Sequence, residues 1–306
     1  MSSLHLTRFA GLPVRPVPAE GPLTGDVAWR MSVEYESKDT FDGLFDRFLA
    51  LPGAERVRAL VVGAWHPFPS EGHSSGDAVR RIAESAKRLP ELRAIYLGDI
   101  TQEESEISWL QQSDVTPLLE AYPALERLEV RGGFGLRLQP VKHASLQALC
   151  VESGGIPAEV VSAVSRSDLP ALTELELWLG IEEYGGDATL ADLAGILSGE
   201  GLPALIHLGL QNSEIQDEIA TAVASAPIVA RLETLALSMG TLTDDGAEAL
   251  LSGQPLTHLR RLDLSHHYLT DAMMERVTAA LPGVKVDLGD QEEPDDGEWF
   301  YVAVSE

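Results

Sequence analysis

Two hydrophobic periods follow one another in residues 232–251, which begin Leu232-Glu233-Thr234-Leu235-Ala236-Leu237 and end Leu242-Thr243-Asp244-Asp245-Gly246-Ala247-Glu248-Ala249-Leu250-Leu251. The first phrase ends in the alternation of apolar and polar positions that is typical of a short β-strand. In the second, Thr and Asp form a helix start signal, and the apolar residues that follow recur at helical spacing. The stretch therefore predicts a strand, a turn and a helix.

The phrase Leu-x-x-Leu-x-Leu returns along most of the chain. Successive phrases start 21 to 35 residues apart, which is about the length of one strand plus one helix. We therefore expect residues 55–290 to form one curved parallel sheet of eight or nine short strands, with helices or irregular segments outside it. The phrases, allowing for conservative replacements and a degenerate last copy, occupy residues 57–62, 92–97, 125–130, 146–151, 172–177, 205–210, 232–237, 259–264 and 284–288.

These phrases resemble leucine-rich repeats, and Leu-Thr-Asp-x-Gly-Ala-x-x-Leu at 242–250 is similar to the ribonuclease-inhibitor-like subtype. The whole chain also resembles a bacterial family of leucine-rich-repeat proteins. The resemblance implies an α/β solenoid with its parallel sheet on the concave face and its helices outside. The repeat usually has Asn three residues after the last strand leucine, and this chain departs from that pattern. We therefore expect its turns to depend on glycine's freedom in φ; the corresponding positions are Ile100, Gly133, Gly154, Gly180, Ser213, Gly240 and His267.

The pattern divides the chain into three parts. Residues 1–53 form an N-terminal cap, in which 27–35 alternate as a half-buried strand and 41–49 carry the apolar stripe of a helix. Residues 54–290 hold the repeats. Residues 291–306 are an acidic C-terminal segment, whose Trp299-Phe300-Tyr301-Val302-Ala303-Val304 has the composition of a strand. That segment is either a capping strand or a free tail.

Composition and charge narrow the function classes. Hydrophobic residues make up 44% of the chain and charged residues 23%, which is enough apolar content for a sizeable core. The formal charge of −26 repels phosphate backbones and anionic lipid surfaces, so we expect no nucleic acid or membrane partner. The lone Cys150 gives no disulfide framework, and the first residues lack a secretory pattern. We therefore expect a cytoplasmic protein.

The cysteine, the histidines and the acidic run do not occur in the patterns typical of catalytic or metal-binding sites. Cys150 lies on a strand between carboxylates, which would raise rather than lower the pKa of a thiol. The pairs His66 with His73 and His266 with His267 lack the spacing of a zinc site. The acidic run 290–298 lacks the order of a calcium loop, and the glycines at 132–135 are not followed by a helix start with a lysine. We therefore predict no catalytic residue, no metal and no cofactor.

The remaining candidate is the concave face itself. If the phrase leucines point into the core, the residues between them face the concave side. We predict a non-enzymatic scaffold that binds a protein or peptide on this face, and the negative charge of the chain favours a basic partner. The alternative is a hydrolase or transferase with its site in the loops 63–76 and 98–116. The predicted partner-binding residues are Tyr96, Arg127, Glu129, Arg131, Glu152, Glu174, Glu176 and Trp178.

Overall fold

The computed structural model describes residues 4–35, 37–70 and 72–306, and in this part of the chain twelve strands form one sheet in chain order. Strands β2 to β12 pair in parallel, and β1 pairs with β2 in the antiparallel sense. The strands are β1 (Arg8–Phe9), β2 (Leu12–Pro16), β3 (Ala28–Met31), β4 (Ala59–Val62), β5 (Ala94–Leu97), β6 (Arg127–Arg131), β7 (Ala148–Glu152), β8 (Glu174–Gly180), β9 (His207–Ser213), β10 (Thr234–Ala236), β11 (Arg261–Asp263) and β12 (Lys285–Asp287).

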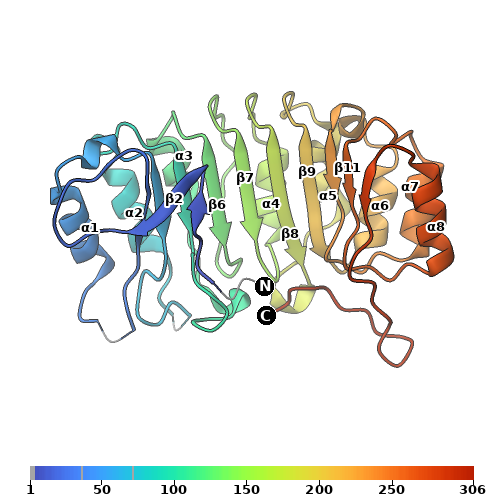
Figure 1. Ribbon diagram of the computed structural model, residues 1–306, viewed down its shortest axis with the longest axis horizontal. Helices are drawn as coiled ribbons and strands as arrows, with labels where there is room; N and C mark the ends of the chain where they lie inside the picture. Colours follow the sequence, from blue (N-terminus) through green and yellow to red (C-terminus); the bar gives the residue numbers. More distant parts are fainter. Residues whose placement is uncertain (1–3, 36, 71) are drawn as a thin grey trace.

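Helices follow most of the strands and lie behind the sheet in Figure 1. Their start signals act as the sequence predicts: the hydroxyls of Thr40, Thr243 and Thr270 each accept a hydrogen bond from a backbone N–H in the first turn. The α-helices are α1 (Phe41–Ala50), α2 (Gly76–Glu84), α3 (Thr116–Ala121), α4 (Ala158–Ser165), α5 (Leu190–Ser198), α6 (Gln216–Val223), α7 (Asp244–Ser252) and α8 (Asp271–Ala280). Four short 3-10 helices are η1 (Ala54–Arg56), η2 (Ile107–Trp109), η3 (Glu182–Tyr184) and η4 (Pro227–Arg231).

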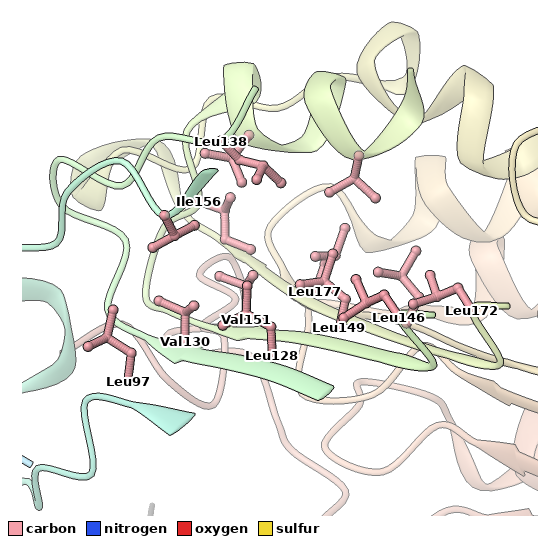
Figure 2. Close-up of a cluster of buried hydrophobic side chains, with 14 of the residues drawn as sticks. Leu97, Leu128, Val130, Leu138, Leu146, Leu149, Val151, Ile156, Leu172 and Leu177 are labelled. Carbon is pink, nitrogen blue, oxygen red and sulfur yellow. The ribbon is translucent and has the colours of Figure 1, made fainter. Parts of the chain in front are cut away.

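The phrase leucines form the core between the sheet and the helices. Leu175, Leu208, Leu235 and Leu262 are paired across successive strands, and each is almost fully buried. Figure 2 shows the same packing in the middle of the chain, where leucines and valines of neighbouring repeats meet behind the strands. The predicted solenoid with its parallel register is confirmed.

The side of the sheet that faces away from the helices is the concave one. Neighbouring strands lie about 4.8 Å apart, whereas packed helices need about 8 to 10 Å between their axes. A layer of helices beside a layer of strands therefore forces the sheet to curve toward its strand side. The residues that alternate with the phrase leucines lie on this concave face.

The turns after the strands differ from the expected glycine turns. Of the four glycines at the asparagine position, Gly180 alone has a positive φ, of 76°. A Cβ on Gly133 would lie 2.0 Å from the carbonyl oxygen of Gly155, so this glycine is required for close backbone contact rather than for its φ. At His267 a side chain takes the asparagine's place: Nδ1 accepts from the Leu269 N–H, and Nε2 donates to the Leu288 carbonyl. Turn packing, more than φ freedom, explains the departure from asparagine.

The N-terminal segment folds over the concave face. Strand β2 continues the sheet beyond β3, and β1 turns back across it (Figure 1). Phe9 packs there on a cluster formed by small and apolar side chains of β3 to β5. The sequence analysis did not predict β1 or β2, and it did not predict this cover.

The C-terminal segment runs back along the sheet edge where the strands end (Figure 1). The Asn212 side chain donates to the Val304 carbonyl and accepts from the Val304 N–H, and Ser108 donates to the Ser305 carbonyl. Val302 and Val304 are buried, whereas the three aromatic residues at 299–301 are exposed. This segment is therefore neither a strand beyond β12 nor a free tail, but a strap along the edge.

Candidate functional site

The predicted partner-binding residues come together on β5 to β8. One row across four strands consists of Tyr96, Glu129, Cys150 and Glu176. The row before it holds Arg127 on β6 and Glu174 on β8. Arg131 pairs with Glu152 in the row that follows. The alternation predicted from the sequence therefore places the whole set on one face, although its members differ in how exposed they are.

Arg127 joins two of the glutamates. One of its terminal nitrogens lies 2.5 Å from Glu129 Oε1 and the other 2.6 Å from Glu174 Oε2, so one guanidinium bridges β6 and β8. Burial raises the pKa of Glu129, although the Arg127 guanidinium opposes this effect. The side chains of Glu174 and Arg127 stay about one-third exposed. The Arg127 cluster is therefore a partly solvated network whose charges a partner could contact.

Arg131 forms a second, more buried pair. Its Nη1 lies 2.8 Å from Glu152 Oε2, and the same carboxylate oxygen accepts a hydrogen bond of 3.4 Å from the Tyr96 hydroxyl. Arg131 is 5% exposed, and its Nη2 has no acceptor among the described residues. Arg131 therefore holds Glu152 in place and offers little surface of its own.

Glu176 lies between a histidine and the single thiol. His207 Nε2 is 2.8 Å from Glu176 Oε1, and this hydrogen bond lowers the pKa of the Glu176 carboxyl. The other oxygen accepts a weak hydrogen bond of 3.7 Å from Cys150 Sγ. Burial, reinforced by the glutamates around it, raises the pKa of the Cys150 thiol well above its usual range. A thiolate is therefore disfavoured at this position.

Tyr96 faces the concave side, as predicted, but Phe9 covers it. The two rings meet edge to face with centroids 5.7 Å apart, and Tyr96 is only 5% exposed. The sequence predicts Tyr96 as a partner-binding residue, but in the structure its ring is not accessible to a partner. The reason is the N-terminal segment, which fills this part of the face.

Trp178 is half-buried near the end of β8, where it pairs with Gln211 of β9. Its Nε1–H is buried without an acceptor among the described residues. Trp178 is therefore neither fully buried nor fully exposed, and it lies on the same strand as Glu174 and Glu176.

In the first of the two candidate loops, the two histidines stack on one another. The His66 and His73 rings stack with centroids 3.4 Å apart, and His66 Nδ1 accepts from the Phe68 N–H. Residue 71 of the loop 63–76 lies outside the described residues. Within the described ranges, no group of three or more metal-ligating side chains was found, and no helix is both long and apolar enough to cross a bilayer. The alternative of an enzyme site in these loops stays untested.

Taken with its outer helices, the parallel sheet defines a repeat solenoid that is built around leucine phrases. A family model described as leucine-rich repeat matches residues 232–251 and 256–272. The chain is also similar to a solved structure of a protein from Bacteroides fragilis, with 31% sequence identity and a TM-score of 0.78. That alignment covers 86% of this chain and 74% of the other. The chain belongs to the leucine-rich-repeat family. A search of curated proteins found no match.

Proposed function

We propose that the chain is a non-enzymatic scaffold that binds a protein or peptide on the open part of its concave face, along β6 to β9. The observation that carries the proposal is the set of four partly exposed glutamates on three adjacent strands, next to the half-buried Trp178. Leucine-rich repeats form the scaffold, and Phe9 covers facing side chains of β3 to β5, whereas the four glutamates stay 17 to 36% exposed. The glutamates are Glu129, Glu152, Glu174 and Glu176.

Charge favours a basic partner. Residues 138–306 contain 7 Lys and Arg against 28 Asp and Glu, whereas residues 1–137 contain 15 against 20. The negative potential is thus concentrated on the part of the solenoid that begins beside the open glutamates. A field of this sign speeds the encounter with a cationic segment and repels nucleic acid and anionic membranes. We also propose a cytoplasmic location, because the lone Cys150 gives no disulfide framework. The phrase at 242–250 supports repeats of the ribonuclease-inhibitor-like subtype.

The test selects basic peptides from a displayed library on the wild-type chain and then measures their binding to variants. Reversing Glu174 and Glu176 to Lys should slow association and reduce its salt dependence, because partly solvated charges steer encounter. The matched control reverses Glu218 and Glu275, which are exposed on the outer helices α6 and α8. Stopped-flow and calorimetric titrations should show the change in the concave variant alone. Equal effects in both variants would contradict the assignment of the face.

Trp178→Ala provides the second measurement on the same peptides. A central aromatic anchor costs about 2 kcal/mol or more of binding free energy when it is truncated. Trp178→Phe is the matched control, because it keeps an aromatic ring and removes the unpartnered Nε1–H. Unchanged affinity in both the tryptophan and the glutamate variants would move the binding surface away from the concave face.

A further inference from the structure

We propose that the chain has a second binding site, which adjoins the open glutamates and shares Arg127 and Glu174 with their network, and which takes an organic monoanion: one carboxylate carried on a small apolar group. The site is a pocket of about 500 Å³ where β4 to β8 begin, beneath the tip of the β1–β2 hairpin. This volume is within the range of pockets that hold small molecules, roughly 300 to 1,000 Å³.

Three alanines form the floor of the pocket, inside a rim of polar and charged side chains. Ala59, Ala94 and Ala148 are the first residues of β4, β5 and β7, and each is buried. A larger residue at these positions would fill the space that the pocket occupies. The hairpin tip at residues 10–12 forms the opposite wall. An apolar group of modest size can therefore lie between the alanines and the hairpin.

Three arginines line the rim of this pocket, in a chain whose formal charge is −26. Arg127 is already held by two glutamates. Arg93 lies beside two glutamates, with Nη2 3.5 Å from Glu91 and Nε 3.9 Å from Glu126, and its Nη1 donates to two backbone carbonyls of its own turn. Arg58 is exposed and forms no salt bridge with any residue that the structure describes. Arg58 therefore has its guanidinium fork available for a carboxylate, with Arg93 beside it.

Two acidic residues limit the charge that the pocket can accept. Glu126 and Glu174 also line it, and because Arg93 and Arg127 each lie beside two glutamates, Arg58 is the one lining arginine without an ion pair among the described residues. A polyphosphate or a dicarboxylate would meet these glutamates, whereas a monocarboxylate would pair with Arg58 and leave Arg127 in its network. The same chemistry could come from a free small molecule or from the C-terminal residue of a peptide.

Calorimetric titration with defined probes tests the site. The probes are 3-phenylpropionate, N-acetylphenylalanine, an acetylated tripeptide that ends in phenylalanine with a free carboxylate, and the same tripeptide as its amide. We expect the free carboxylates to bind, and the amide to bind at least about tenfold more weakly, because a charge-assisted pair is lost. Equal binding of acid and amide, or no saturable binding by any acid, would overturn the proposal.

Two variants locate the binding. Arg58→Gln should weaken the acids at least about tenfold, and the control Arg166→Gln, at an exposed arginine next to α4, should leave them unchanged. Ala148→Leu fills the floor and should abolish binding of all acids. Binding that survives Arg58→Gln and Ala148→Leu would overturn the site. Binding of all acids with similar affinity indicates a free small molecule as the source, and binding of the tripeptide acid alone indicates a peptide C-terminus.

Discussion

Along β3 to β5 the concave face is mostly apolar and lies beneath the chain's own N-terminal segment, whereas along β6 to β9 it is charged and partly exposed. In the first region Phe9 packs on small and aromatic side chains, and the charged exception, Arg30, is paired with Asp99. In the second region arginines, glutamates and a histidine pair across strands, with 17 to 36% of each side chain exposed. The same backbone repeat therefore carries a buried face at one end and a recognition face in the middle.

The comparison shows that the residue types on the concave face match its exposure: apolar residues where another segment covers the strands, and charged residues where solvent reaches them. Exposing apolar side chains to water costs free energy, and Phe9 keeps water away from this set. The set comprises Ala59, Val61, Ala94 and Tyr96. Charged residues on the following strands can stay in solvent without that cost. Three changes test whether the two regions differ in this way.

Phe9→Ala should have the largest effect on stability. It removes a buried aromatic side chain from the cover over Tyr96, and truncations of this kind cost about 3 to 5 kcal/mol in a core, somewhat less near a chain end. We expect about 2 to 4 kcal/mol in urea unfolding, with Tyr96 becoming accessible. Trp178→Ala, in the open region, should cost about 1 kcal/mol or less. Equal losses in the two variants would remove the distinction between the regions.

Deleting residues 302–306 should have an intermediate effect. The deletion leaves the buried amide of Asn212 without its Val304 partners and uncovers the Ser108 hydroxyl. Unsatisfied buried polar groups cost about 1 to 3 kcal/mol, which thermal unfolding would detect. Deleting Glu306 alone is the control, since it removes only an exposed contact with Tyr184. A melting temperature unchanged by the longer deletion would show that the strap is not stabilising.

Glu176→Gln should have the smallest effect on the free energy of unfolding at neutral pH, below about 1 kcal/mol, because Glu176 and His207 are both partly exposed. The direction in which this effect changes with pH follows from the pKa of Glu176. The folded state lowers the pKa of Glu176 through His207, so the carboxylate stabilises the fold above its unfolded pKa and loses that contribution as the pH falls through the folded pKa. Acid unfolding curves should therefore fall less steeply below about pH 4.3 in the variant than in the wild type. A steeper fall would contradict the assignment of this pair.

Sequence reasoning predicted the solenoid because the leucine phrases carry both strand period and repeat length. It also placed Glu129, Glu152, Glu174 and Glu176 on one face, since alternation in a strand determines the side on which a residue lies. The local phrase is enough for these results. What a side chain meets across the face requires long-range packing as well.

The missed features are all long-range. The cover by Phe9 joins residues far apart in sequence. Its signal in the sequence is an alanine at the first position of each of β3, β4 and β5, where β6 and β8 carry charged residues. The aromatic residues at 299–301 suggested a docking strand, yet Val302 and Val304 make the buried contacts. The strap meets Asn212 and Gly154 at the edge of distant repeats. Asn212 hydrogen-bonds Val304, and Gly154 lets the carbonyl of Ser305 come close, since a Cβ there would lie 2.3 Å from its oxygen. No local pattern contains that information.

The strap has a consequence for how the chain reaches its native state. In most solenoids each repeat contacts only its neighbours, so folding can propagate from one end while synthesis continues. Here Ser108 donates to the carbonyl of Ser305, and Asn212 donates to that of Val304, which ties the middle repeats to residues that are made after all twelve strands. The earlier repeats can assemble during synthesis, but their shared edge closes only once residues 302–305 have left the ribosome. Closure at that late moment couples the unfolding of central repeats to that of the terminus, and makes an otherwise modular array more cooperative.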